Sequence, residues 1–277
     1  MQKTRRQYRI RPSVTFHLFF GLYLMVHFGE ARVFGQQAGS YQAQMFIKQN
    51  DSMAYRLAKP TKPAKATSAV KHPLLIFLHG SGERGNDNLA QLIHGGNRMA
   101  RLAEEQNAYV LMPQCPAHES WHNGKATVKS NQRRYAYPKS SDPNEQLDMV
   151  FALIEDFVQR HPVDLNRLYI GGLSMGAMGT LELLRQHPDY FAGAFAICGG
   201  AHPKTSKALK STPLWLFHGL DDKVVLPQYS IKLYKKLKRK GADVQLTTYS
   251  KVGHDSWHQS FAEPTLFPWL FAQRNGQ

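Results

Sequence analysis

Short apolar runs alternate with amphipathic helical patterns along most of this chain, and this alternation restricts the fold more than any other feature. The expected strands are 73–80, 108–114, 167–174, 191–200, 212–219 and 244–250. A continuously apolar run such as PLLIFLHG is typical of a strand buried on both faces of a parallel sheet. Strands that alternate with helices predict an α/β domain with a mostly parallel central sheet flanked by helices and with right-handed crossovers.

The segments between these runs have helical spacing. Helices are expected at 87–106, 142–161, 175–188, 226–241 and 256–274. The first is interrupted at Gly95–Gly96, and the second has Asp142 as its expected N-cap and Pro143 in its first turn. A short hairpin around Asn50–Asp51 comes before them. The stretch 115–141 reads as a long loop, which in a compact domain is usually functional or disordered.

The first residues have the pattern of an export signal. Residues 1–13 are basic and contain no acid, and Val14–Phe28 is an apolar run that is short for a membrane span. The small residues that follow allow cleavage after Ala31 or Gly35. The sequence therefore predicts a signal peptide at 1–35 that is removed from the mature protein.

Export would leave residues 36–277 as one folded domain, secreted or periplasmic and without stable membrane insertion. An uncleaved membrane anchor is the alternative. Arg5 and Arg6 could belong to a twin-arginine signal, but the general export route is favoured because few neighbours of the pair suit that signal.

The chain is strongly basic, with a formal net charge of +15 at pH 7. Removal of residues 1–35 lowers this charge to +10. A positive surface favours polyanions such as acidic polysaccharides, although solubility alone is the simpler explanation. No zinc-finger spacing, RNA-binding aromatic motif or basic zipper is present, so nucleic acid is not expected as a partner.

Cys115 and Cys198 are the only cysteines in the chain. In an exported protein they could form one disulfide. The alternative is two buried thiols, since free cysteine is often a core residue. Sequence alone leaves both possibilities open.

The stretch GGLSMGAMG places Ser174 between a predicted strand and a predicted helix. This is the setting in which G-x-S-x-G forms a nucleophile elbow. Gly172 and Gly176 lack the Cβ atoms that would clash in so sharp a turn. The Ser174 hydroxyl would then lie at the carboxyl edge of the sheet, beside a helix N-terminus that favours negative charge.

A serine hydroxyl needs a base, and in this fold the order is serine, acid, histidine. Asp221 and Asp222 follow one later strand, and His254 follows the next. All three loops leave the carboxyl edge of a parallel sheet, where open α/β sheets bind ligands. His254 is expected to take the Ser174 proton, and an aspartate to orient the imidazole.

Other histidines have simpler explanations. His79 and His218 each end an apolar strand before glycine, and we expect them to bond to loop backbone. His254 and His258 have the i, i+4 spacing of a metal pair, but H-E-x-x-H and a third ligand are missing. No metal and no cofactor are therefore predicted.

These motifs together resemble the α/β-hydrolase superfamily. More narrowly, the chain is similar to bacterial esterases of the predicted-peptidase or phospholipase/carboxylesterase-like type, which are related to polyhydroxybutyrate depolymerases and feruloyl esterases. The resemblance covers about residues 40–273 and rests on FLHGSGERGNDN, MPQCP, GLSMGAMG, HGLDDKVV and GHDSW, in that order. It implies an α/β-hydrolase fold with a short N-terminal hairpin and a catalytic domain at 36–277.

The resemblance also assigns residues. The family pattern H-G-x-x-D-x-x-V favours Asp222 over Asp221 as the acid, and G-H-[DN]-x-W gives His254 as the base. It implies that the N–H groups of Ser81 and Met175 form the oxyanion hole; for Met175 the elbow geometry predicts the same.

Loop and pocket residues complete these expectations. Glu83, Arg84 and Asn86 are expected to fix the loop that carries Ser81, although Glu83 and Arg84 could form a simple surface pair. Trp121 and Trp257 are candidate substrate-binding residues, with core packing as the default for a tryptophan. The chain lacks the H-G-G-G loop and the large apolar insertion of lid-bearing lipases, which argues against long-chain triglycerides.

The sequence therefore predicts a serine carboxylesterase that forms an acyl-enzyme on Ser174. Its substrates would be short-chain or carbohydrate-linked esters, such as acetyl or feruloyl groups on a small molecule or polysaccharide. A serine peptidase of the prolyl-oligopeptidase type and a non-catalytic surface- or glycan-binding protein on the same fold are the alternatives. The sequence gives no indication of the oligomeric state.

Overall fold

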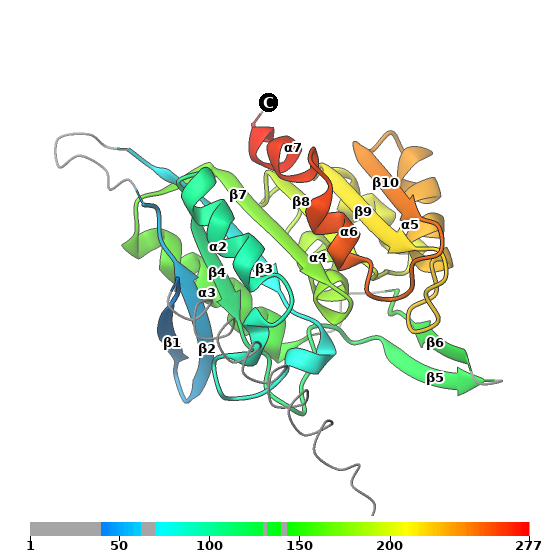
Figure 1. Cartoon of the computed structure of the whole chain (residues 1–277), viewed down its shortest axis with the longest axis horizontal. Helices are drawn as coiled ribbons and strands as arrows, with labels where there is room; N and C mark the ends of the chain where they lie inside the picture. The colour runs from blue at the N-terminus through cyan, green and yellow to red at the C-terminus, as the bar shows by residue number, and fades with distance from the viewer. Residues whose placement is uncertain (1–39, 62–69, 130–131, 140–142, 277) are drawn as a thin grey trace, which may run out of the picture. The chain divides into compact units, whose positions relative to one another are not determined.

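The computed structural model describes residues 40–61, 70–129, 132–139 and 143–276. Their main element is an eight-stranded sheet with the strand order β1-β2-β4-β3-β7-β8-β9-β10, shown in Figure 1. The strands are β1 Gln42–Lys48, β2 Asp51–Ala58, β3 His72–Leu78, β4 Tyr109–Pro113, β7 Val163–Leu173, β8 Gly193–Ile197, β9 Leu214–Gly219 and β10 Val244–Tyr249. From β4 to β10 in this order all pairs are parallel, whereas β1 and β2 pair antiparallel at one edge. The predicted α/β-hydrolase fold is confirmed.

Helices cover both faces of this sheet (Figure 1). They are α2 Gly96–Glu105, α3 Glu145–Arg160, α4 Met175–Gln186, α5 Gln228–Lys238, α6 Trp257–Ala262 and α7 Leu266–Ala272, with short 3-10 turns η1 Ser81–Glu83, η2 Ala90–Leu92 and η3 Pro203–Lys210. Apolar residues of α3, α4 and α5 pack on one face, and those of α2 and α7 pack on the other. All seven residues of β3 are buried, as expected for a strand between two helical layers.

One predicted helix cap is wrong. Helix α3 begins at Glu145, and its N-cap is Asn144, whose Oδ1 accepts a hydrogen bond from Leu147 N at 2.9 Å. Asp142 was expected in this role, but it precedes the true cap by two residues and lies outside the described residues. Both side chains are good N-caps, so composition could not choose between them.

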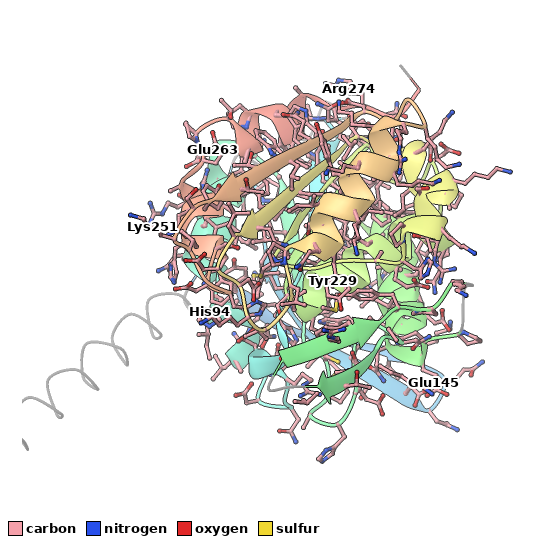
Figure 2. All side chains as sticks on the ribbon, turned by 90° about the vertical axis from the view of Figure 1, so that its right-hand side faces the viewer. His94, Glu145, Tyr229, Lys251, Glu263 and Arg274 are labelled. Atoms are coloured by element: carbon pink, nitrogen blue, oxygen red, sulfur yellow. The ribbon has the colours of Figure 1, made fainter. Side chains whose placement is uncertain are left out.

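The stretch 115–141, predicted as a loop, contains an antiparallel hairpin of β5 Lys125–Lys129 and β6 Gln132–Ala136. Its strands are polar and lack the apolar alternation that marks a half-buried strand. Tyr135 N donates a hydrogen bond to Tyr229 Oη at 2.8 Å and joins the hairpin to α5. Figure 2 shows the hairpin crossing the molecule next to Tyr229.

The structure decides the question of the cysteines. Cys115 and Cys198 are both buried free thiols and do not form a disulfide with each other. Burial raises the pKa of the Cys115 thiol to about 12, so this thiol stays protonated and unreactive near neutral pH.

The predicted signal peptide at 1–35 lies outside the described residues, so the division into a leader and a domain from residue 36 stays a prediction. In the part of the chain that the structure describes, no helix combines the length and apolar character needed to cross a membrane.

Candidate active site

Ser174 occupies a sharp turn between β7 and α4. Its backbone angles are φ 52° and ψ −115°, a conformation that a residue with a side chain rarely adopts. Close packing explains the two flanking glycines. A Cβ on Gly172 would lie 2.5 Å from the Gly176 backbone, and one on Gly176 would lie 1.9 Å from the carbonyl oxygen of Leu78.

Replacing Gly176 with alanine is expected to lower the free energy of unfolding by about 3 kcal/mol or more, because the added Cβ meets backbone that cannot rotate away. Urea unfolding followed by circular dichroism measures the change. Gly82→Ala is the matched control, since a Cβ at Gly82 has nothing within 4 Å. Equal stability of the two variants would contradict this explanation of the elbow.

His254 lies in the loop between β10 and α6, beside Ser174. Its Nε2 is 2.9 Å from Ser174 Oγ, and its Nδ1 is 2.7 Å from Asp222 Oδ2. A carboxylate can only accept, so His254 Nδ1–H donates to Asp222. The neutral ring then leaves Nε2 free to accept the hydrogen of the Ser174 hydroxyl, which is the arrangement that a general base requires.

Asp222 is buried, and both of its carboxylate oxygens accept hydrogen bonds. Its Oδ1 accepts hydrogen bonds from Val224 N at 2.8 Å and Val225 N at 2.9 Å. Burial alone would raise the pKa of Asp222, but hydrogen bonds from His218, His254 and Val225 more than offset it and hold the pKa well below its usual value. The carboxylate is therefore ionised throughout the neutral and mildly acidic range. Asp221 is exposed.

His218 has a larger part in the site than the sequence indicated. Its Nε2 lies 2.8 Å from Val225 O, which confirms the expected bond to loop backbone, and 3.1 Å from Asp222 Oδ2. Both neighbours are acceptors, so Nε2 carries the hydrogen. The spacing of four residues in HGLDD was the available signal that His218 also orients the acid.

The loops that carry Asp222 and His254 are fastened to each other. Leu220 N donates to Tyr249 O and Asp221 N to Val252 O, both at 2.9 Å. A Cβ on Gly219 would lie 2.2 Å from the carbonyl oxygen of Gly253, so only glycine allows this approach. The imidazole and the carboxylate are thereby fixed in position before any substrate binds.

Ser81 and Met175, the predicted oxyanion donors, lie on two segments in direct contact. Ser81 begins η1 after β3, and Met175 is the first residue of α4, where helix N–H groups lack intrahelical acceptors. The loop before Ser81 packs on the elbow, since the position of a Cβ on Gly80 is 3.6 Å from Ser174 Cβ.

His79 confirms its expected structural role. Its Nε2 accepts a hydrogen bond from Cys115 N at 2.9 Å, and its Nδ1 lies 2.6 Å from the carbonyl oxygen of Gly80. Burial lowers the pKa of His79 to about 4, which keeps the ring neutral and allows Nε2 to accept. His79 thus fixes the loop that carries Ser81.

Glu83 is buried, whereas a simple surface pair with Arg84 would leave its side chain exposed. It is 5% exposed, and its Oε2 has no hydrogen-bond partner among the described residues. His94 Nε2 is 3.6 Å from Glu83 Oε1. Burial raises the pKa of Glu83 and lowers the pKa of His94, and both shifts oppose an ion pair between them.

The two predicted pocket tryptophans differ. Trp257 stands edge-on to the imidazole of His254, with ring centroids 5.9 Å apart, and so borders the site. Trp121 is fully buried against His79 and against α4 at Gly179. It offers no surface to a ligand, and its predicted pocket role is corrected to core packing.

Residues 63–267 match the model of a family described as phospholipase/carboxylesterase. The chain belongs to this family. It is a serine hydrolase of the carboxylesterase and thioesterase group, and it acts on carboxylic esters.

Known relatives of this phospholipase/carboxylesterase family member include esterases and a thioesterase. Acyl-protein thioesterase 1 of Debaryomyces hansenii is 25% identical over an alignment of 236 positions that covers 77% of this chain and 94% of that protein. The bifunctional acetylxylan esterase/xylanase of Neocallimastix patriciarum is 25% identical over 163 residues, which are 58% of this chain and 21% of that protein. The crystal structure of a thermostable esterase superposes with a TM-score of 0.74 at 32% identity, covering 86% of this chain and 64% of that one. This chain thus spans slightly less than two thirds of the thermostable esterase.

Proposed function

We propose that the protein cleaves carboxylic esters through an acyl-enzyme on Ser174, with His254 as general base and Asp222 as the acid that orients it. The observation that carries the proposal is the chain of hydrogen bonds from Ser174 Oγ through both ring nitrogens of His254 to Asp222 Oδ2, at 2.9 Å and 2.7 Å.

In the first step, Ser174 Oγ attacks the ester carbonyl carbon while its proton passes to His254 Nε2. The imidazolium formed is stabilised by the Asp222 carboxylate. The tetrahedral intermediate collapses as His254 returns the proton to the leaving alcohol. A water then attacks the acyl-enzyme by the same route, and the carboxylic acid leaves.

The negative oxygen of each tetrahedral intermediate would accept hydrogen bonds from the N–H groups of Ser81 and Met175. The N-terminus of α4 adds its favourable dipole. Removing one such donor typically costs about 10²- to 10³-fold in kcat.

As substrates we propose short-chain or carbohydrate-linked esters met outside the cytoplasm. The likeness to an acetylxylan esterase/xylanase supports a carbohydrate ester, and the pattern of an export signal at 1–35 supports this location. A second candidate is an acyl thioester, because the similarity to acyl-protein thioesterase 1 extends over 94% of that protein. A peptide bond would pass through the same tetrahedral intermediate, so peptides belong in the same test.

A fluorophosphonate probe should label the full chain once, on the peptide that contains Ser174, as read by mass spectrometry. The labelled protein should lose hydrolysis of p-nitrophenyl acetate in parallel. A panel of acetylated xylan, methyl ferulate, a palmitoyl thioester and a peptide then ranks substrates by kcat/KM, with the acetyl ester expected first. Labelling elsewhere, or activity that survives full labelling, would refute the assignment.

A further inference from the structure

Positive charge is concentrated on η3, α5 and the turn that follows α5. The basic residues here are Lys204, Lys207, Lys210, Lys232, Lys235, Lys236, Lys238, Arg239 and Lys240. Neither 203–210 nor 228–241 contains an acid. The two elements pack against each other, and Figure 2 shows them side by side, α5 in orange and η3 in yellow, with nitrogen-tipped side chains along the outer edge.

A groove of about 540 Å³ runs along η3 on this surface. Its lining contains Lys139, Lys204, Lys207 and Lys210, and none of these four lysines forms an ion pair with any residue that the structure describes. We call this the lysine groove. Unneutralised like charges repel, so an anionic ligand in the groove would relieve a cost that the free protein carries.

The two other charged residues of the lining change the net positive charge of the groove little. Arg185 also lines the groove, but its guanidinium is already paired with Glu182. Asp189 is the one acid of the lining. The lysine groove therefore keeps a strong positive excess.

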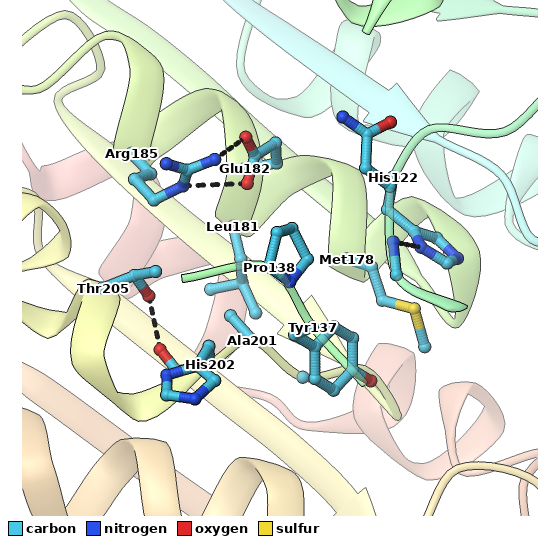
Figure 3. A pocket seen from close by; sticks show the side chains of 13 residues that line it. His122, Tyr137, Pro138, Met178, Leu181, Glu182, Arg185, Ala201, His202 and Thr205 are labelled. Carbon is cyan, nitrogen blue, oxygen red and sulfur yellow. Dashed lines mark hydrogen bonds and ion pairs between the residues drawn. The ribbon is translucent and has the colours of Figure 1, made fainter. Parts of the chain in front are cut away.

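The lysine groove adjoins a smaller hollow on helix α4, the helix that begins directly after Ser174. Arg185 and Thr205 line both the groove and this hollow, which also contains Met178 and Tyr137. Figure 3 shows this hollow, with Arg185 and Thr205 at one side and Met178 and Tyr137 at the other. Met178 N bonds to Ser174 O, so Met178 is one helical turn from the proposed nucleophile.

The residue types in and around the groove indicate which class of polyanion it would bind. Its lining has no aromatic residue on which the bases of a single-stranded nucleic acid could stack. None of the large exposed apolar side chains of the described residues lies on η3, α5 or the groove, whereas a helix that enters a membrane interface presents them. Lysines act as mobile point charges and suit carboxylates spaced along a flexible chain.

We propose that the lysine groove binds a carboxylate-bearing polysaccharide and thereby delivers esters carried by that polymer to Ser174. The groove supplies affinity for the polymer, and the site supplies the chemistry. The delivery step rests on the proposed function, whereas the binding step does not.

The test uses the full chain with Ser174→Ala, so that binding is measured without turnover. Its affinity for polygalacturonate is determined by isothermal titration calorimetry at 50 and 300 mM NaCl. We expect binding that weakens with salt. The triple change Lys204→Glu, Lys207→Glu and Lys210→Glu should weaken it at least about tenfold.

The control is Lys48→Glu, Lys71→Glu and Arg101→Glu, three exposed residues outside the patch with the same change in net charge. We expect less than about threefold weakening from it. Equal losses in both triple variants would overturn the proposal. Equal binding of a neutral arabinoxylan, or tighter binding of phosphatidylglycerol vesicles or duplex DNA, would also overturn it.

The two proposals fail in different ways. With Ser174 restored, the lysine-groove variant should hydrolyse p-nitrophenyl acetate at the wild-type rate. Hydrolysis without polymer binding would remove the groove proposal alone. Polymer binding without any ester hydrolysis would remove the proposed function and, with it, the delivery step, but would leave the binding step standing.

Discussion

Replacing Ser174 with alanine is expected to lower kcat for p-nitrophenyl acetate by about 10⁶-fold, and replacing His254 with alanine should cost about as much. The reason is that the two groups act as a unit across the 2.9 Å hydrogen bond that joins them. Without the base the hydroxyl stays a weak nucleophile, and without the hydroxyl the base has no proton to take. The double variant should therefore be no slower than either single variant.

Steady-state and burst kinetics on the four proteins measure this coupling. The proposed oxyanion donors remain in all of them, so the three variants should keep a residual rate about 10³-fold above that in water. Ser52→Ala and His118→Ala, both at exposed positions, are the controls. Additive losses in the double variant would show that Ser174 and His254 act independently, which the proposed mechanism does not allow.

The chain pattern predicted most of the fold because buried parallel strands have a simple signature. Each run that is buried on both faces, such as β3 or β8, is nearly uniform in apolar character and needs no knowledge of its partners. The hairpin β5–β6 lacks that signature, since its strands pair mainly with each other. Tyr135 joins it to the rest of the chain through contacts with Tyr229 and His122. The existence of the hairpin was therefore not predictable from the local pattern.

The candidate site was partly predictable for a related reason. Ser174, Asp222 and His254 each follow a strand of one parallel sheet, so topology alone brings them to one edge. Topology does not predict how deeply each side chain near the site is buried. Trp121 lies entirely in the core, and Glu83 is buried beside the elbow, because helix α4 and the β3 loop approach closely at glycines.

Replacing Asp222 with asparagine is expected to lower kcat by about 10⁴-fold while the fold persists. The N–H groups of Val224 and Val225 would keep the amide oxygen in the place of Oδ1, which turns the NH₂ group towards His254 and His218. That NH₂ would donate to His254 Nδ1 and force the ring hydrogen onto Nε2. A protonated Nε2 of a neutral ring cannot take the Ser174 proton. Asp221→Asn, one residue away and exposed, should keep wild-type activity.

The same variant tests the electrostatics through stability. The pKa of Asp222 is depressed in the folded protein, so its ionised form contributes stability above the unfolded value of about 3.9, and this contribution is lost as pH falls below that value. The Asp222→Asn variant should therefore be less stable than wild type at pH 7, and the difference in free energy of unfolding should shrink towards pH 3. Urea denaturation at both pH values measures it. A constant difference would mean that the carboxylate charge contributes nothing, and more than a tenth of wild-type activity at pH 7 would mean that Asp222 does not set the tautomer of His254.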